Sequence, residues 1–403
     1  MDVERVVVVG GGVLGMMHAL EARRRGHEVV HLEREPVPRG ASVRNFGLIW
    51  VSGRAPGAEL ELALRARARW AQIAVQVPGT GFRAVPSLTL AADEAELGLL
   101  KEAASLPEAG LRGYELLGPD ECRAVNGALR GEFTGGLLGS RDAIVEPRQV
   151  LGVLRAHLAS SPAGYTWLPG REAVELSPHA VRDHTGAWHR GDLVILCPGA
   201  AHSGIAGPHL AAWDRAPVRR VRLQMMQTEP FPARLTTSLA DGDSLRYYPA
   251  YDLPGRGRLA PQAPVAARTK AQLLLVQRLD GGLTIGDTHE YSEPFAFDVD
   301  EDAYDHLRGR AEALLGTALP RVRRRWAGVY SMVTTDSLYH VSEAAPGVTL
   351  VTGPGGRGMT CAPAIAEETF ARAGQPTPSG LPAPSGRPAP AGPPAPAATA
   401  EES

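Results

Sequence analysis

The sequence is poor in cysteine and contains no long apolar run. Its three cysteines, Cys122, Cys197 and Cys361, are widely spaced and form no CxxC pair, so the sequence predicts neither a disulfide framework nor a thiolate metal site. No stretch is long enough to span a bilayer, and the start of the chain does not have the pattern of a signal peptide. We therefore expect a cytoplasmic protein without a metal site or a membrane anchor.

The sequence also has no large excess of positive or negative charge. The 403 residues include 42 Lys and Arg against 44 Asp and Glu, for a formal net charge of −2. This balance predicts neither a nucleic-acid-binding footprint nor a polybasic membrane patch. With 44% hydrophobic and 21% charged residues, the chain is expected to form two globular domains or one large α/β unit.

A glycine motif near the start indicates a dinucleotide site. In VVVVGGGVLG, an apolar strand leads into GxGxxG, a helix and the second strand HEVVHLERE. The glycines allow the pyrophosphate to approach the helix N-terminus, and the Glu33 carboxylate suits the two ribose hydroxyls of an adenosine. The motif alone leaves open whether the dinucleotide is a nicotinamide or a flavin. The cofactor-binding residues predicted here are Gly10, Gly12, Val13, Leu14, Gly15, Glu33 and Arg34.

A second glycine loop occurs near residue 355, in TGPGGRGMTCAPAIAEE. It follows a strand and precedes a helix that we expect to begin near Ala362 or Pro363, with its N-terminus aimed at a flavin ring. A plain nicotinamide dehydrogenase does not need such a return of the chain to its cofactor. The loop RGASVRNFGLIW is expected beside the flavin. Further predicted cofactor contacts are Ser42, Asn45, Phe46, Gly47, Val174, Pro198, Gly199, Gly355, Gly356, Arg357, Gly358, Met359 and Thr360.

Between these motifs, alternating patterns predict antiparallel strands over residues 218–230, 244–252 and 271–291. Residues 254–268 are expected to form a surface loop, and residues 301–316 an amphipathic helix. The fold class is α/β: a Rossmann-like FAD-binding domain of the GR2 type with an interleaved α+β substrate domain built on an antiparallel sheet. The FAD-binding parts are predicted at 1–77, 142–220 and 325–373, the substrate parts at 78–141 and 221–324, and a disordered Pro/Ala-rich tail at 374–403.

Together the glycine motifs with Glu33, LVILCPGA, RRWAGVY and GPGGRGMTCAPAIAE resemble the D-amino-acid oxidase/glycine oxidase family of FAD-dependent oxidoreductases. The resemblance implies non-covalent FAD and oxidation of a C–N bond. A hydride passes from the carbon to flavin N5, the imine hydrolyses, and oxygen or another acceptor takes the electrons.

One position departs from the family. Amino-acid oxidases of this family carry an arginine after W-x-G that holds the substrate carboxylate, and this chain has Tyr330 there. The chain is more similar to a branch associated with phosphonate metabolism, which shares RNFGLIW and RLQM. This resemblance implies an aminoalkylphosphonate substrate, such as 2-aminoethylphosphonate or its N-methyl form, oxidised to the aldehyde.

A tetrahedral anion requires several donors. We assign catalytic roles to Tyr248, His289, Tyr330 and Arg357, and substrate binding to Arg44, Arg246 and Tyr247. No lysine, cysteine or acidic pair stands out as a general base. The alternatives are a glycine, sarcosine or D-amino-acid-type amine oxidase or dehydrogenase, an NAD-dependent dehydrogenase, and a non-catalytic flavin-binding protein. The sequence leaves open a homo-oligomer and the electron acceptor.

Overall fold

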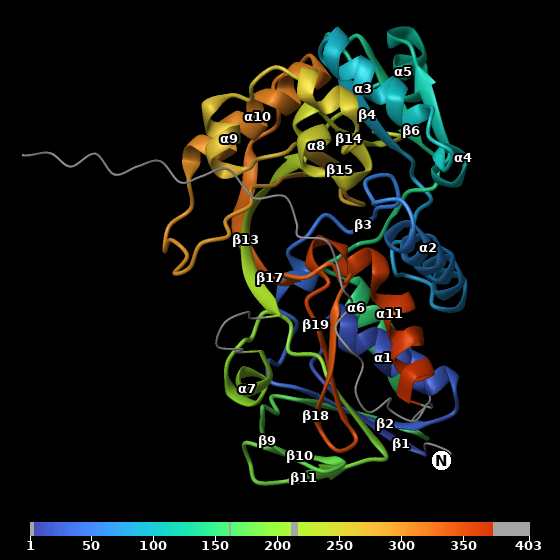
Figure 1. Ribbon diagram of the computed structural model, residues 1–403, viewed down its shortest axis with the longest axis vertical. Coiled ribbons are helices and arrows are strands. Elements are labelled where there is room, and N and C mark those ends of the chain that lie inside the picture. Colours follow the sequence, from blue (N-terminus) through green and yellow to red (C-terminus); the bar gives the residue numbers. More distant parts are fainter. Residues whose placement is uncertain (1–3, 161–162, 211–216, 374–403) are drawn as a thin grey trace, which may run out of the picture.

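The computed structural model describes residues 4–160, 163–210 and 217–373, so the predicted tail at 374–403 lies outside the described residues. Two large sheets dominate, and Figure 1 shows them one above the other. The lower sheet has six strands, parallel except for the antiparallel edge strand β18. In spatial order they are β18 (His340–Ala345), β19 (Val348–Thr352), β12 (Leu193–Leu196), β1 (Arg5–Val9), β2 (Glu28–Glu33) and β8 (Tyr165–Pro169).

Strand β1 is the buried parallel strand that its valine run predicts. Val6 and Val8 pack on the helices on one face, while Val7 and Val9 pack on the other face. The turn into α1 requires glycine, because Gly10 has φ +107° and a Cβ there would lie 2.3 Å from the Cys197 carbonyl oxygen. The predicted Rossmann-like α/β fold is confirmed in this sheet.

The second sheet is mainly antiparallel, with one parallel pair between β14 and β4. Its longest strand, β13, has the bounds that the sequence predicts and pairs with β17 along nearly its whole length. In spatial order the strands are β17 (Val322–Val333), β13 (Val218–Pro230), β16 (Gly282–Gly286), β15 (Leu274–Gln277), β14 (Ser238–Ala240), β4 (Ser87–Ala91), β6 (Gly135–Gly139) and β5 (Tyr114–Leu117).

Helices cover both sheets. Those with the six-stranded sheet are α1 (Val13–Arg24), α2 (Ala58–Gln76), α6 (Val150–Ala159) and α11 (Gly358–Ala373). Those with the eight-stranded sheet include α3 (Glu94–Ala104), α5 (Pro119–Val125), α8 (Gly242–Tyr247), α9 (Pro264–Thr269) and α10 (Glu301–Leu315). Two small sheets pair β9 (Ala173–Ser177), β10 (Ala180–Asp183) and β11 (Trp188–Arg190), and β3 (Leu48–Ile49) with β7 (Ala143–Ile144). Among the described residues, no helix is long and apolar enough to cross a membrane.

The strand predicted over residues 244–252 is wrong. These residues form the end of α8 and a 3-10 turn over Pro249–Tyr251. Asp241 caps α8 by accepting a hydrogen bond from the Asp243 N–H, and Pro249 starts the turn that follows. The loop predicted over residues 254–268 also contains structure, a 3-10 turn over Pro254–Arg258 and helix α9.

Helix α11 begins at Gly358, one turn earlier than predicted, and Pro363 lies inside it. Proline has no N–H for the carbonyl oxygen of Met359, four residues earlier. The indole Nε1 of Trp70 on α2 donates to that oxygen at 2.9 Å. A side chain from another helix therefore supplies the missing donor and allows the helix to start earlier.

The predicted domain boundary at residue 324 falls within β17, which belongs to the eight-stranded sheet through Val333. Assigning residues 325–333 to the FAD-binding part is therefore corrected, because the chain returns to the six-stranded sheet at β18. A buried carboxylate joins its own segment to two others between the sheets. Asp142 accepts hydrogen bonds from the Val51 N–H, the Ser52 N–H and hydroxyl, and the Ser87 hydroxyl.

Two buried histidines lie beneath the first glycine turn. On α1, His18 places Nδ1 2.7 Å from the Leu14 carbonyl oxygen and Nε2 3.0 Å from the Thr369 hydroxyl on α11. On β2, His31 places Nε2 3.0 Å from the Gly10 carbonyl oxygen. Burial lowers the pKa of each to about 4, so both imidazoles are neutral in the folded protein at neutral pH.

Because both histidines are buried in the neutral form, we predict that the protein loses stability in acid. Their folded-state pKa lies below the ordinary value of 6.5. Their contribution to the free energy of unfolding is therefore complete above about pH 6.5 and is lost as the pH falls toward about 4. We expect His18→Gln to give a free energy of unfolding that depends less on pH in this window, measured by urea denaturation. The control is His157→Gln on the exposed side of α6, which should keep the wild-type slope. Equal slopes in all three proteins would contradict the prediction.

Candidate cofactor and substrate site

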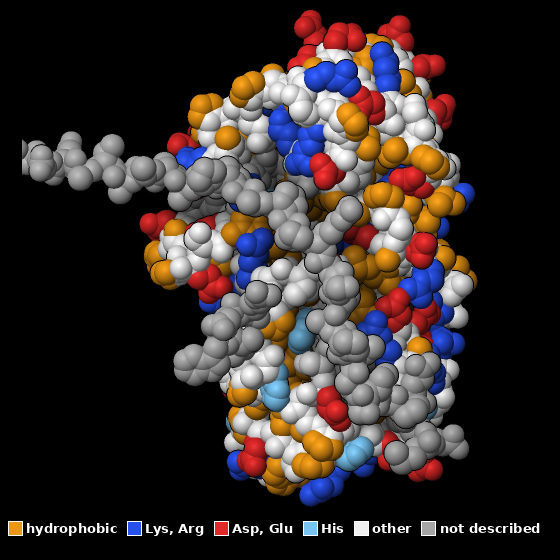
Figure 2. All heavy atoms as spheres, viewed as in Figure 1, with side chains coloured by type: hydrophobic (Ala, Val, Ile, Leu, Met, Phe, Trp, Pro, Cys, Tyr) orange, Lys and Arg blue, Asp and Glu red, His pale blue; other side chains and the backbone are white. Residues whose placement is uncertain are grey.

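A cavity of about 1000 Å³ lies between the two sheets and is lined by residues of both. One part runs from the β1–α1 turn past the end of β2, and the other reaches Tyr247, His289 and Tyr330 at the second sheet. On the face in Figure 2, Lys and Arg side chains are interspersed with Asp and Glu, as the small net charge leads one to expect. The cavity is the candidate site because it is large and because residues of both sheets line it.

The first helix N-terminus opens onto this cavity. Gly12 is the N-cap residue of α1 and provides no side-chain cap, while the Ser42 hydroxyl accepts a hydrogen bond from the Val13 N–H at 2.9 Å. A Cβ at Gly15 would lie 1.8 Å from the Gly10 carbonyl oxygen, so the helix packs directly on the turn. The positive end of the helix dipole is thus available to a pyrophosphate.

Glu33 lies beside this turn at the end of β2. Its carboxylate accepts hydrogen bonds from the N–H groups of Gly11 and Glu35. A Cβ at Gly11 would lie 2.9 Å from Glu33 Oε2 and 2.8 Å from the Trp167 ring. A carboxylate held at the strand end next to an open helix N-terminus fits an adenosine ribose on one side and a pyrophosphate on the other.

A second helix N-terminus meets the same cavity at Gly355–Gly358, where a 3-10 turn leads into α11. Arg357 is fixed in this turn by its bonds to the carbonyl oxygens of Pro354 and Leu338, at 3.1 and 3.0 Å. Its guanidinium also lies 3.6 Å from Glu59, which Arg54 approaches to 3.5 Å from the other side. Two arginines share one carboxylate, so this end of the cavity keeps a net positive charge.

These features fit FAD. Glycines line one end of the cavity, and the Glu33 carboxylate lies where it can bind the ribose. Two helix N-termini open onto the same cavity. The second N-terminus and the paired arginines suit the pyrimidine edge of a flavin, which becomes negative on reduction. A nicotinamide dinucleotide would leave this second end without a function.

Comparison with known proteins agrees with this geometry. A family model described as "FAD dependent oxidoreductase" (DAO) matches residues 5–372. The chain belongs to this family. It is therefore an FAD-dependent oxidoreductase, and the expected cofactor is confirmed.

The chain is 25% identical over 389 residues to the tRNA 5-methylaminomethyl-2-thiouridine biosynthesis bifunctional protein MnmC of Caulobacter sp. strain K31. The match covers 91% of this chain but spans only about half, 54%, of that relative. Among solved structures, glycine oxidase from Geobacillus kaustophilus superposes with a TM-score of 0.71 at 20% identity, covering 93% of this chain and 96% of that one. Iminodiacetate oxidase from Chelativorans sp. BNC1 gives 0.72 at 18% identity, covering 94% and 97%. The two structures share the fold.

Most of the predicted cofactor-binding residues line the cavity, and three do not. Gly47, with φ +70°, is packed against the Val145 carbonyl oxygen, and the Thr360 hydroxyl bonds the backbone of Leu48 and Trp50. Val174 points to solvent from β9, and its neighbour Ala173 lines the cavity instead. For the others, direct contact with FAD stays a prediction.

Four predicted residues meet at the second sheet. The rings of Tyr247 and His289 stack with centroids 4.1 Å apart, and Tyr248 meets Tyr247 edge-on at 5.1 Å. Tyr330 reaches the same region of the cavity from β17. Burial raises the pKa of all three tyrosines, so their hydroxyls remain protonated hydrogen-bond donors at neutral pH.

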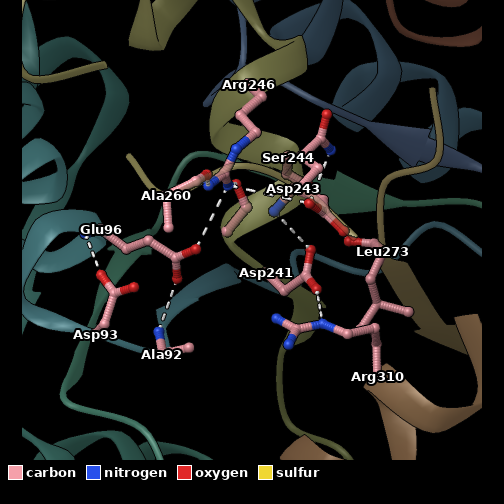
Figure 3. Close-up of polar contacts among 12 residues, drawn as sticks. Ala92, Asp93, Glu96, Asp241, Asp243, Ser244, Arg246, Ala260, Leu273 and Arg310 are labelled. Carbon is pink, nitrogen blue, oxygen red and sulfur yellow. Dashed lines mark hydrogen bonds and ion pairs between the residues drawn. The ribbon is translucent and has the colours of Figure 1, made fainter. Parts of the chain in front are cut away.

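The two remaining predicted arginines differ in position. Arg44 lines the cavity and donates to the Ala327 carbonyl oxygen at 2.9 Å. Arg246 is not among the lining residues, and its assignment to substrate binding is corrected. Figure 3 shows its side chain directed toward Glu96, in a network that also contains Asp241, Asp243 and Arg310. Residue 246 lies in the last turn of α8 rather than on a strand, and this directs the guanidinium toward Glu96 and away from the cavity.

Sequence reasoning missed several residues of the substrate region. Asp287, Gln272 and Tyr291 line it, together with the apolar side chains of Leu223, Met225 and Leu274. The segment GDTHEY indicated His289, while Asp287 two residues earlier was passed over. A carboxylate directly after a fully buried strand is the signal that could have identified it.

We predict that Arg246→Ala lowers stability without affecting the site. The guanidinium donates to the Gly242 and Ala260 carbonyl oxygens at 2.7 and 2.6 Å and lies 3.5 Å from Glu96. Its loss leaves the buried Glu96 carboxylate without this cation and should cost about 1–3 kcal/mol of unfolding free energy. The control is Arg258→Ala, an arginine that is 70% exposed. If Arg246→Ala instead lost amine-dependent flavin reduction while its stability stayed unchanged, Arg246 would belong to the substrate site.

Proposed function

We propose that this enzyme oxidises the C–N bond of a small anionic amine, namely an aminoalkylphosphonate such as 2-aminoethylphosphonate or its N-methyl form. The product is the aldehyde, formed by hydrolysis of the imine, and oxygen or another acceptor takes the electrons. The observation that carries the proposal is the composition of the substrate region, where neutral hydroxyl donors stand in place of a single carboxylate-binding arginine.

Tyr330 is central to this argument. It occupies the β17 position where the family resemblance leads us to expect arginine, and its hydroxyl belongs to a group with those of Tyr247 and Tyr291. These three phenols lie close enough to influence one another's pKa. A phosphonate presents three oxygens in a tetrahedral arrangement and accepts hydrogen bonds from several directions, whereas a guanidinium fork matches a planar carboxylate.

Positive charge from the cavity wall supports an anionic substrate. Arg44 has no carboxylate within ion-pair distance among the described residues. The pKa of Arg148 is lowered first by burial and then by the positive charges of Arg324 and Arg44, so Arg44 lies in a region rich in positive charge. The Arg54 and Arg357 pair and the N-terminus of α11 add to the positive potential. These groups attract the anion without forming a fixed bidentate site.

When bound, FAD supplies the acceptor for two electrons. The protein residues bind and orient the amine so that its reacting C–H bond faces this acceptor, and the apolar side chains of Leu223, Met225 and Leu274 exclude water. The phenols stay neutral and hold the anionic end of the substrate. The amine nitrogen must reach the reaction without a proton, because its lone pair forms the new C=N bond.

A second candidate is an amine oxidase or dehydrogenase acting on a small amino acid. It is favoured by the similarity of the fold to glycine oxidase and iminodiacetate oxidase. It requires another donor for the carboxylate, and Arg44 is a cavity arginine that has no carboxylate within ion-pair distance among the described residues.

An anaerobic amine panel tests the proposal. The holoenzyme is mixed with 2-aminoethylphosphonate, its N-methyl form, glycine, sarcosine or D-alanine, and bleaching of the visible flavin band is followed by stopped flow. We expect an aminophosphonate to reduce the flavin about 100-fold more efficiently than the amino acids, because only it satisfies the phenol donors.

Two controls separate the recognised groups. 2-Hydroxyethylphosphonate keeps the anion but has no C–N bond, and ethylamine keeps the amine but has no anion; neither should match the aminophosphonate. Efficient reduction by glycine or sarcosine with none by the aminophosphonates would overturn the phosphonate assignment.

A further inference from the structure

Asp287 is a buried carboxylate that the proposed reaction has not yet used. It follows β16, is 5% exposed and lines the substrate region of the cavity. Oδ1 accepts a hydrogen bond from the Gln272 side-chain amide at 3.1 Å. Within the part of the chain that the structure describes, no arginine or lysine approaches the carboxylate within 4.0 Å, and the nearest basic side chain is His289, with Nε2 4.0 Å from Oδ2.

The other carboxylates that line the cavity have different surroundings. Glu33 and Glu35 lie at the glycine turn, Glu172 is exposed, and Glu59 is shared by Arg54 and Arg357. Asp287 alone combines burial, a position among aromatic rings and the absence of a strong cation. A buried carboxylate is costly unless a partner offsets its desolvation.

The surroundings of Asp287 would suit a positive nitrogen. Tyr247, Tyr248 and Tyr330 provide aromatic rings whose faces attract cations. The Gln272 side-chain amide donates a hydrogen bond to Asp287 Oδ1 and also donates to the Tyr248 hydroxyl at 3.4 Å. The second oxygen, Oδ2, lies 4.0 Å from His289 Nε2 and has no arginine or lysine within that distance among the described residues.

We infer that Asp287 binds the substrate nitrogen as an ammonium ion and then takes its proton, which makes Asp287 the general base of this enzyme. The inference rests on the proposed oxidation of an amine, and it adds that the substrate enters as a cation at nitrogen. In this arrangement the Asp287 carboxylate faces the nitrogen, and the hydroxyls of the neighbouring tyrosines are left for the phosphonate oxygens.

The proton transfer is balanced. One N–H bond of the ammonium breaks and one O–H bond forms on Asp287, which gives a neutral amine beside a neutral carboxylic acid. The lone pair left on nitrogen is then free to form the C=N bond when the C–H hydrogen is removed with its electron pair. FAD, when bound, would supply the acceptor for those two electrons. Asp287 returns its proton to solvent after product release.

The electrostatics agree with this role. The titratable groups that face Asp287 are His289 and the phenols of Tyr247, Tyr248, Tyr291 and Tyr330. Burial raises the pKa of Asp287, and the charge of His289 acts in the opposite direction. A carboxylate with a raised pKa is a better proton acceptor from an ammonium ion than an exposed aspartate.

A binding experiment tests the cation site independently of turnover. Ethylammonium chloride is titrated into the oxidised holoenzyme, and the shift of the flavin spectrum gives a Kd; ethanol is the uncharged comparison. We expect wild type to bind ethylammonium at least about tenfold more tightly than Asp287→Asn does, as for a hydrogen bond between charged groups. The matched control is Asp280→Asn, on the exposed turn of the same hairpin, which should bind as wild type.

Kinetics test the proton transfer. With whichever amine reduces the flavin, Asp287→Asn should lower the reduction rate on the order of 100-fold at pH 7 and regain much of it at high pH, where the amine is already neutral. Flavin content should stay at the wild-type value. An equal loss at every pH, or unchanged kinetics, would overturn the role as base.

The failure modes are distinct. If no amine reduces the flavin but ethylammonium binding still depends on Asp287, the proposed function fails and the cation site stands. If an amine reduces the flavin and the variant behaves as wild type, the inference fails and the function stands. Should Asp287→Asn not fold, equal affinity of wild type for ethylammonium and ethanol would still overturn the inference.

Discussion

The packing of the first helix against the last is the contact on which the site depends. His18 on α1 lies within hydrogen-bond distance of Thr369 on α11, and Phe370 lies next to the His18 ring. Because this contact holds α1 beside α11, the two helix N-termini open onto one cavity although about 340 residues separate them along the chain. The imidazole is neutral, so the contact does not place a buried charge beneath the cofactor.

The two sheets divide the chemistry between them. Residues of the six-stranded sheet and its helices supply the glycine turns, Glu33 and the positive region around Arg54 and Arg357. The second sheet and its connections supply the substrate region: β13 and β15 carry the apolar side chains and β17 carries Tyr330. Tyr247 comes from the end of α8, and Asp287 directly follows β16. The chain crosses between the sheets at segments joined by Asp142, so the wall of the substrate region is anchored to the cofactor half by buried hydrogen bonds.

The elements governed by local pattern could be predicted from sequence. The valine run of β1, the glycine spacing before α1, the bounds of β13 and the amphipathic α10 all follow from periodicity or steric need. Where tertiary contacts decide, prediction failed. The early start of α11 depends on Trp70 from α2, and the orientation of Arg246 depends on Glu96 from α3.

The same distinction applies to the site. Glycine motifs identified one wall of the cavity because backbone geometry restricts those positions to glycine. The tyrosines and His289 were recognisable as residue types, but their convergence required the β13–β17 and β15–β16 pairings. Asp287 was missed although it directly follows a fully buried strand, because the sequence does not show which side chains surround it. The fold shows that no arginine or lysine of the described residues lies within 4.0 Å of its carboxylate.

A crystal structure of the oxidised holoenzyme with 2-aminoethylphosphonate, obtained without oxygen at low temperature, would show directly how the substrate is held. We expect the nitrogen at Oδ2 of Asp287 and the phosphonate oxygens at the hydroxyls of Tyr247 and Tyr330. A ligand bound in the reverse orientation, or a phosphonate held by a bidentate arginine with the nitrogen away from Asp287, would contradict this expectation.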